Sequence, residues 1–336
     1  MKKFVKKEAL FSTGFLLLLT FMVCAQLKIF RVAKITQQTI SLKQNIMSAL
    51  PVDSISLAGV IDFHCHTGPD VNPRCLNDLQ LVRLAKHAGM RGIVLKNHYT
   101  ITADRAELAM QEVGGIGVFG GIVLNRSVGG INAEAVSRMI QIEGHRGKVV
   151  WLPTKDAENI FENPPGPRQF VSVVKRGKPV AELKELFQIV AQNDLVLETG
   201  HSSPKESLII IAAAKQAGVK KIVVTHAMLL GATINQMKQM AAMGAVIECC
   251  WQPAGLAGAK STGNPVSILN FVSAIKAIGA EHFIIDSNLG QKTNPLHPDG
   301  MRAFISALNF GGLSMHDIDL MACQNPAELL GLPPSH

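Results

Sequence analysis

Two histidines separated by a single residue, His64 and His66, follow a short apolar run at residues 59–63. Alternate residues of a β-strand face the same side, so both imidazoles are predicted to point at one spot while Cys65 points away. Imidazole nitrogens bind zinc and similar divalent ions. The pair therefore predicts a metal site where a first strand ends, and a purely structural role for both rings is the alternative.

Residues of similar chemistry stand at the ends of four later strand-like runs. They are Lys96 and His98, Glu198 and His201, His226, and Asp286. His64 and Asp286 are 222 positions apart, yet each of these residues comes where an apolar run ends. A common position relative to the strands predicts that their side chains converge in the fold.

The elements that must position them alternate regularly from residue 59 onward. The predicted strands are 59–63, 92–95, 118–124, 149–152, 195–197, 221–225, 245–248 and 283–285, and the predicted helices are 77–88, 102–113, 132–143, 180–193, 204–217, 233–243, 265–278 and 301–310. Several of these helices are followed by a glycine, a residue type that ends a helix before the next strand.

Eight strands alternating with eight helices predict an α/β fold, a parallel (β/α)8 TIM-type barrel, at residues 59–336. A doubly wound open sheet is the competing fold, but no Gly-x-Gly-x-x-Gly motif follows the first strand. In a TIM barrel the catalytic groups collect at the carboxyl ends of the strands, which share one mouth. Every candidate residue named so far stands at such a strand end.

With these residues the chain resembles the amidohydrolase superfamily of metal-dependent hydrolases. The resemblance lies in His64-Cys65-His66, His201, His226 and Asp286, placed after strands one, five, six and eight, and it covers essentially all of residues 59–332. The stretches DFHCH at 62–66 and LKNH at 95–98 look like an uncharacterised amidohydrolase-like family known only as a domain of unknown function.

The resemblance implies roles for these residues. His64, His66 and Asp286 would hold one divalent ion, while His201 and His226 would hold a second or, in a one-metal enzyme, stabilise the transition state. A bound ion makes water acidic enough to act as a nucleophile near neutral pH, and Asp286 would take its proton. The resemblance thus implies zinc, as one or two ions.

The sequence departs from the superfamily after strand four. A carboxylated lysine or a glutamate usually bridges two metals there, whereas this chain continues Trp151-Leu152-Pro153-Thr154-Lys155. Lys155 lies beyond a proline in a long loop, so Lys96, carboxylated or not, is the favoured lysine inside the mouth. Lys96 and His98 would then bridge ions or polarise the substrate, and the metal count stays open.

Three further residues are candidates for supporting roles. Arg74 and Arg126 are predicted to bind an anionic substrate, although loop arginines commonly have no special role. Glu198 is predicted to orient a histidine, with a buried salt bridge to Lys96 as the alternative.

The positive charge lies at the amino terminus. The formal charge is +8, but the first eight residues contribute +3 and residues 26–45 with four cations and no acid contribute +4, so the rest of the chain is nearly neutral. This argues against a nucleic-acid partner for the barrel. Lysines before an apolar run predict a signal peptide at 1–25, with a helical segment at 26–58 that contacts a membrane as one alternative.

Export places the barrel in the periplasm, or on a membrane if the signal remains uncleaved. Three function classes compete for it. The first is a metal-dependent hydrolase of an amide, ester or lactone bond in a small molecule. The second is a phosphoesterase of the polymerase-and-histidinol-phosphatase type, and the third is an inactive barrel that binds a ligand. An odd number of cysteines after the signal does not suggest a disulfide framework. The sequence does not define the oligomeric state.

Overall fold

The computed structural model describes residues 55–160, 169–251 and 266–334. The chain divides into two units, Met1–Pro51 and Val52–His336, and the fold below is that of the second unit. The predicted signal peptide lies outside the described residues, as does the 26–58 segment up to residue 54.

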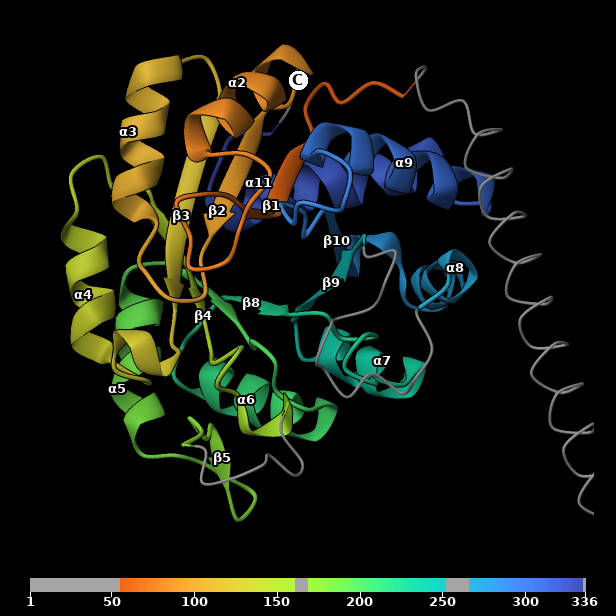
Figure 1. Cartoon of the computed structure of the whole chain (residues 1–336). Helices are drawn as coiled ribbons and strands as arrows, with labels where there is room; N and C mark the ends of the chain where they lie inside the picture. Colours follow the sequence, from red (N-terminus) through yellow and green to blue (C-terminus); the bar gives the residue numbers. More distant parts are fainter. Residues whose placement is uncertain (1–54, 161–168, 252–265, 335–336) are drawn as a thin grey trace, which may run out of the picture. The chain divides into compact units, whose positions relative to one another are not determined.

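Eight parallel strands form the centre of this unit (Figure 1). They are β1 (Ile61–His66), β2 (Gly92–Lys96), β3 (Gly117–Val123), β4 (Gly147–Trp151), β7 (Val196–Glu198), β8 (Lys221–Val224), β9 (Val246–Cys250) and β10 (Phe283–Asp286), hydrogen-bonded in that order. The His66 amide donates to the Leu289 carbonyl at 2.9 Å and joins the end of β10 to β1. The predicted parallel (β/α)8 barrel is confirmed.

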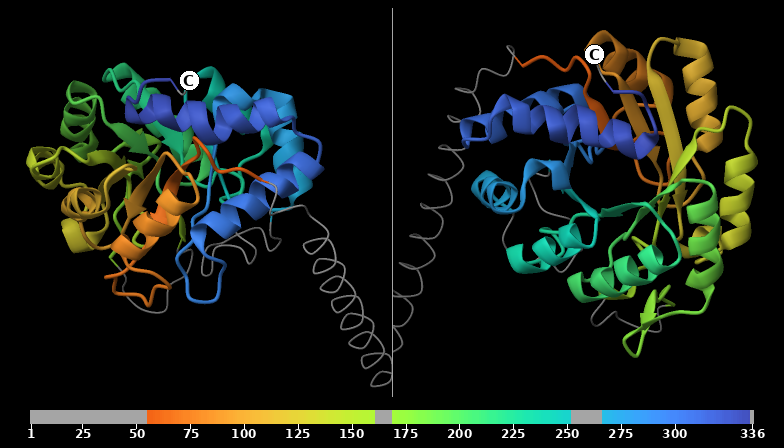
Figure 2. Two further views of the ribbon diagram at one scale, coloured as in Figure 1. Left: turned by 90° about the horizontal axis from the view of Figure 1, so that it is seen from above. Right: turned by 180° about the vertical axis from the view of Figure 1, so that it is seen from behind.

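Helices follow the strands and surround them (Figures 1 and 2). They are α2 (Asp78–His87), α3 (Ala103–Val113), α4 (Ala133–Gln141), α5 (Glu182–Gln192), α6 (Pro204–Gln216), α7 (Ile234–Ala242), α8 (Ile268–Ile278), α9 (His297–Phe310), α10 (Met315–Asp319) and α11 (Asn325–Leu330), with a π-helical turn at Leu320–Gln324. Short 3-10 turns lie at Arg126–Val128, Glu158–Ile160 and Ala280–His282.

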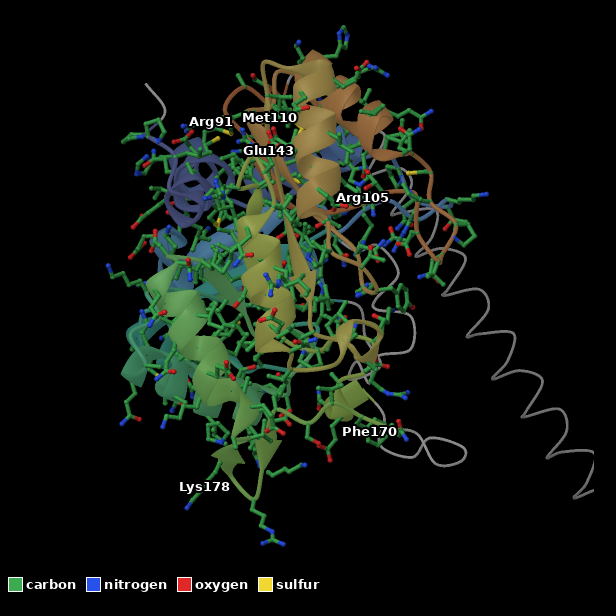
Figure 3. All side chains as sticks on the ribbon, turned by 90° about the vertical axis from the view of Figure 1, so that its left-hand side faces the viewer. Arg91, Arg105, Met110, Glu143, Phe170 and Lys178 are labelled. Atoms are coloured by element: carbon green, nitrogen blue, oxygen red, sulfur yellow. The ribbon has the colours of Figure 1, made fainter. Side chains whose placement is uncertain are left out.

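Besides the helices α10 and α11, which were not predicted, two details differ from the prediction. His64 and His66 lie within β1 rather than after it, because the backbone ladder to β2 continues to His66. A small antiparallel hairpin, β5 (Val174–Lys175) and β6 (Lys178–Pro179), lies in the loop after β4 (Figures 1 and 3). Its turn is tight because Arg176 and Gly177 both adopt positive φ, the conformation of a two-residue hairpin turn.

A β-bulge in β1 changes which side chains enter the barrel. One extra residue separates Asp62 from Cys65 relative to the facing residues of β2. Phe63 therefore packs in the inner apolar cluster while Cys65 packs in the outer one, between strands and helices. The prediction that Cys65 points away from the two histidines is confirmed.

The amino-terminal end of the barrel is closed by apolar side chains. Ala327, Leu329 and Leu330 of α11 pack in the same inner cluster as Ile61 and Phe63 of β1. Arg91, labelled in Figure 3, precedes β2 and donates to the Pro333 carbonyl at 2.6 Å. The sequence NPAELLGL at 325–332 thus forms the plug of the barrel.

Among the described residues, no helix combines the length and the hydrophobicity that a bilayer crossing requires.

Candidate metal centre at the barrel mouth

Five imidazoles form a closed circuit at the carboxyl ends of the strands. The centroids of neighbouring rings are 5.1 Å apart for His64 and His66, 4.9 Å for His66 and His98, 6.3 Å for His98 and His201, 5.6 Å for His201 and His226, and 4.9 Å for His226 and His64. All five side chains are buried. The structure therefore brings together every histidine that the sequence singled out.

Glu248 lies between two of these rings. Its Oε1 is 2.8 Å from Nδ1 of His64, and its Oε2 is 2.7 Å from Nδ1 of His226. The two rings stack with an interplanar angle of 16°. Because Glu248 engages both Nδ1 atoms, each ring turns its Nε2 atom away from the carboxylate, in the direction a metal ligand requires.

Glu248 is the residue that the sequence analysis missed. It is the last residue of the predicted strand 245–248, and the structure extends this strand to Cys250, so Glu248 lies inside β9. The available signal was its chemistry, because it is the one acidic residue in the otherwise apolar strand VIECC.

Local backbone features hold the histidines in place. Gly200 has a φ of +61°, and a Cβ atom there would lie 2.2 Å from the Leu152 carbonyl oxygen, so only glycine fits. This approach lets the His201 amide donate to the Pro153 carbonyl at 2.9 Å. His226 has a φ of 51°, unusual for a residue with a side chain, and its amide donates to Glu248 at 2.8 Å.

The remaining polar groups of the mouth have unpaired atoms. Both carboxylate oxygens of Asp286, Nε2 of His64 and Nζ of Lys96 are buried with no hydrogen-bond partner among the described residues. Lys96 lies over the Trp151 ring, with Nζ 4.8 Å from the ring centroid. Glu198 accepts a bond from the Thr225 hydroxyl at 2.7 Å, and within the described ranges it forms no ion pair with Lys96.

Burial dominates the electrostatics of these groups. It lowers the pKa of His64 to about 3 and the pKa values of His66, His98 and His201 well below 6.5, because a charged ring loses its hydration. Burial lowers the pKa of Lys96 as well.

The carboxyl groups respond in two ways. Burial raises the pKa of Asp286, and it raises that of Glu198 to about 8, in each case with a further contribution from the charge of Glu248. Burial also acts to raise the pKa of Glu248, but the adjacent His226 and His64 overcome it and hold that pKa well below its usual range. Glu248 is therefore the carboxyl group whose surroundings most favour the ionised form.

This donor set fits a divalent metal ion. Ligand atoms of His64, His226 and Glu248 all lie within 4.8 Å of one another. Neutral imidazoles and carboxylates are the ligands that zinc prefers, and buried donor atoms without partners are costly unless something binds them.

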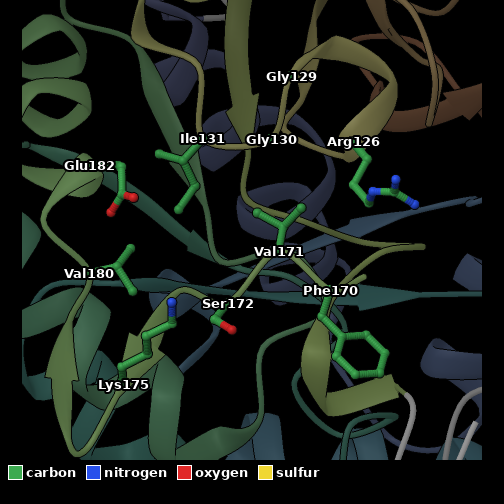
Figure 4. Close-up of a pocket in the computed structure, with 10 residues that line it drawn as sticks. All are labelled: Arg126, Gly129, Gly130, Ile131, Phe170, Val171, Ser172, Lys175, Val180 and Glu182. Atoms are coloured by element: carbon green, nitrogen blue, oxygen red, sulfur yellow. The ribbon is translucent and has the colours of Figure 1, made fainter. Parts of the chain in front are cut away.

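The two predicted substrate-binding arginines lie in different places. Arg74 donates through Nε to Asp70 at 2.7 Å, and its charge is close enough to His66 to lower the pKa of that ring. Arg126 lies at the start of the 3-10 turn Arg126–Val128 and lines a separate pocket of about 450 Å³ with Lys175 and Glu182 (Figure 4). That pocket is lined by none of the five histidines.

The comparisons with known proteins agree with this architecture. A model of a family of unknown function, DUF6282, matches residues 59–248, more than half of the chain. The chain belongs to DUF6282. None of the curated proteins compared with it matches significantly. The predicted membership of a family known only as a domain of unknown function is confirmed.

Solved structures of amidohydrolase type share the fold of this DUF6282 protein. An amidohydrolase from Pseudomonas aeruginosa is 12% identical with a TM-score of 0.51, covering 84% of this chain and 98% of its own. An organophosphorus hydrolase from Deinococcus radiodurans is 14% identical with a TM-score of 0.53, covering 82% and 93%. The probable dipeptidase PvdM from Pseudomonas aeruginosa is 11% identical with a TM-score of 0.54, covering 88% and 98%.

Proposed function

We propose that this DUF6282 protein is a metal-dependent hydrolase that cleaves an amide, ester or lactone bond of a small molecule. The observation that carries the proposal is the closed circuit of five buried imidazoles with Glu248 and Asp286 at the carboxyl end of the barrel. In this fold the reaction takes place at that end.

The ion would be zinc, bound as one or two ions. His64, His66 and Asp286 would hold the first, and His201 with His226 the second. When bound, the metal would acidify a water molecule and polarise the bond to be cleaved. Glu248 orients His64 and His226 through their Nδ1 atoms, and partners of this kind raise metal affinity about 10- to 100-fold in known sites.

Other residues of the chain would handle protons and exclude solvent. Asp286 has two oxygens without a partner among the described residues, so it is free to accept the proton of the attacking water. Trp151 is fully buried and lies beneath Lys96, and together with Phe63 it forms an apolar floor that keeps bulk water out of the barrel. Catalytic charge is stabilised more strongly in a site without bulk water.

Lys96 is proposed as the carboxylated lysine if two ions bind. Its Nζ has no hydrogen-bond partner among the described residues, and burial lowers its pKa, which favours the neutral amine. A neutral amine adds to carbon dioxide and releases one proton, giving a carbamate whose charge two divalent ions would balance. The test is a high-resolution density map around Lys96 in crystals grown with zinc and bicarbonate.

Structures with a similar fold give some support for the bond type. Their names include a lactonase, an organophosphorus hydrolase and a probable dipeptidase. The fold alone does not select among these reactions. A phosphoesterase is therefore the main alternative activity.

The proposal is tested by metal analysis joined to a substrate panel. Elemental analysis of the purified protein is expected to give one to two zinc-like ions per chain, and near none after His64→Ala with His66→Ala. The matched control is His87→Ala with His316→Ala, two exposed histidines on the helices α2 and α10. Equal metal content in all three proteins defeats the proposal.

The panel consists of lactones, amides, carboxylic esters and phosphate esters, assayed with zinc-loaded protein. Hydrolysis of a lactone, amide or ester that depends on the two histidines supports the proposal. Activity restricted to phosphate esters replaces it with the phosphoesterase, and metal binding without any turnover favours the inactive barrel.

We also propose that the chain is exported and acts in the periplasm. The support is the lysine-rich start and the apolar run that ends near Ala25. Cell fractionation with amino-terminal sequencing is expected to find a mature chain that begins near residue 26. A full-length chain in the membrane fraction indicates an uncleaved anchor instead.

A further inference from the structure

A chain of three buried side chains leads from the protein backbone to one imidazole of the mouth. The residues are Asn125, Thr154 and His98, and none has more than 6% of its surface exposed. The hydroxyl oxygen of Thr154 is 2.8 Å from Nδ1 of His98 and 2.9 Å from Nδ2 of Asn125. Backbone groups fix which atoms of Asn125 donate and accept, Asn125 fixes the role of the Thr154 hydroxyl, and Thr154 in turn determines which nitrogen of His98 carries the proton.

The orientation of the Asn125 amide is fixed first. Its Oδ1 accepts from the Thr154 amide at 2.8 Å and from the Asp156 amide at 3.2 Å, and backbone N–H groups only donate. Its Nδ2 lies 2.9 Å from the His98 carbonyl oxygen, which only accepts. A rotated amide would lose all three bonds, so Nδ2 is the atom that faces Thr154.

The Thr154 hydroxyl follows from that orientation. Because Asn125 Nδ2 donates to it, the oxygen acts as an acceptor in this contact, and its own hydrogen must find another partner. Nδ1 of His98 is the one acceptor that contacts this hydroxyl among the described residues. The hydroxyl therefore donates to Nδ1, which must carry a lone pair there.

A neutral imidazole with a lone pair on Nδ1 carries its proton on Nε2. A doubly protonated ring would carry a hydrogen on Nδ1 and could not accept from the Thr154 hydroxyl, so the same contact requires the neutral ring. His98 accordingly presents an N–H group on the side opposite Thr154. A metal ion requires a lone pair, so this ring has the wrong tautomer to be a ligand through Nε2.

Three other rings of the circuit have the opposite tautomer. Nδ1 of His66 faces the Lys96 carbonyl oxygen at 3.1 Å, and the Nδ1 atoms of His64 and His226 face the Glu248 carboxylate. Carbonyl and carboxylate oxygens accept, so these three Nδ1 atoms carry protons and their Nε2 atoms carry lone pairs. The partners of these four rings thus leave three of them suited to bind a metal and make one a hydrogen-bond donor, while Nδ1 of His201 has no partner among the described residues.

We propose that His98 is not a metal ligand but a catalytic residue whose Nε2–H donates a hydrogen bond to the carbonyl or phosphoryl oxygen of the substrate. This inference rests on the proposed hydrolase function for its catalytic part, whereas the tautomer of His98 stands independently of it. Of the two roles that the resemblance allowed for His98, the structure selects polarisation of the substrate over bridging of ions. The oxygen gains negative charge as the bond is attacked, so the hydrogen bond is strongest in the transition state.

The first experiment reads the tautomer in the metal-free protein. Histidine is labelled with 15N, long-range proton–nitrogen spectra are recorded, and the His98 signals are assigned by their loss in His98→Gln. We expect the Nε2–H tautomer in the parent and in Thr154→Ser, which keeps the hydroxyl. Thr154→Val removes the donor and is expected to shift the ring toward a mixture of tautomers. An Nδ1–H tautomer of His98 in the parent overturns the proposal.

Zinc is then added to the same samples. The Nε2-bound proton of His98 is expected to remain, while the ring nitrogens of His64 and His66 change their shifts. Loss of the His98 proton on zinc binding shows that His98 is a ligand and overturns the proposal. If the parent binds no zinc at all, the hydrolase function fails while the tautomer measurement still stands, so the two failures are distinguishable.

Kinetics test the catalytic part with the best substrate of the panel. His98→Ala is expected to lower kcat about 10²- to 10³-fold, as the removal of one transition-state donor does in other enzymes. His98→Gln offers an amide N–H and should recover part of this loss. Both variants should keep the metal content of the parent, and a loss of one ion per chain or an unchanged kcat contradicts the assignment.

Discussion

The two ends of this barrel are made from the same eight strands but have opposite chemistry. At the amino-terminal end, Ile61 and Phe63 pack against Leu329 and Leu330 of α11 in a cluster without polar groups. At the carboxyl end, two or three residues further along the strands, five histidines and three carboxylates face one another. The first end excludes water by close packing, and the second holds polar groups that water or an ion would satisfy.

The distribution of unpaired polar atoms sharpens this contrast. Apart from one nitrogen of Arg91, the buried side-chain atoms without a partner in the described ranges belong to the mouth or its edge; they are found in Asp62, His64, Lys96, Trp151, Glu198, His201, Asp286 and His297. Leaving such atoms unpaired costs about 1–3 kcal/mol each. The apolar end therefore stabilises the fold, while the mouth carries a cost that ligand binding can offset.

The most severe disruption of the mouth is removal of both β1 histidines. We expect His64→Ala with His66→Ala to lose nearly all bound metal and to reduce hydrolysis by at least about 10³-fold, since the metal supplies the activated water. The apolar end is untouched, so circular dichroism should show a folded barrel. Elemental analysis measures the bound metal and the panel assay measures hydrolysis. If the folded variant retains its metal, the mouth is not the end of the barrel that binds it.

Acid should act selectively on the mouth of the metal-free protein. The pKa of His64 is about 3 and those of His66, His98 and His201 lie well below 6.5, so between pH 6.5 and 4.5 the unfolded chain binds protons that the folded chain excludes. Stability then falls as the pH falls through this range.

Two groups oppose this trend. The raised pKa values of Glu198 and Asp286 let the folded chain bind protons that the unfolded chain releases, but they are two groups against four imidazoles. The melting temperature of metal-free protein, followed from pH 7 to pH 4.5, should therefore decrease. A flat profile in this range would show that the rings are hydrated and that the mouth is not the closed site described.

Glu248→Gln should lower the affinity of the mouth for zinc without abolishing zinc binding. The amide can accept from one Nδ1–H of His64 or His226, but its own NH2 group then opposes the second, so one ring must change its tautomer. We expect a 10- to 100-fold weaker affinity for zinc in a chelator competition assay. Glu182→Gln on the exposed side of α5 is the control, and equal affinities would show that Glu248 does not orient the ligands.

Much of the fold was predictable because its signals are local. Each strand is a short apolar run and most helices end before a glycine, so the eight predicted strands and eight predicted helices are all present, with their ends within a few residues, whereas α10 and α11 were not predicted. The ends shifted because ligand residues such as His64 and Asp286 belong to the strand ladder itself. The β5–β6 hairpin was missed because each of its strands has only two residues.

The site was predictable only in part. His64, His66, His98, His201 and His226 stand at strand ends, where the barrel gathers them, and they do converge. Glu248 ended the predicted strand 245–248 but was assigned no role, although it is the one acidic residue of β9. The bonds from Asn125 to Thr154 to His98 join residues 27 to 56 positions apart, so no sequence pattern could indicate which ring carries its proton on Nε2.

The smallest effect on the metal centre is expected from damage to the opposite end. Leu330→Ala removes a side chain that is 5% exposed and packs within the inner cluster, so it should lower the free energy of unfolding by about 2–3 kcal/mol. Zinc affinity and kcat should stay within twofold of the parent, because Leu330 packs in the inner apolar cluster, which includes none of the five histidines. Denaturant unfolding and the panel assay measure the two quantities. A fall in kcat well beyond twofold in the folded Leu330→Ala variant would contradict this expectation. It would show that the plug helps to position the residues of the mouth.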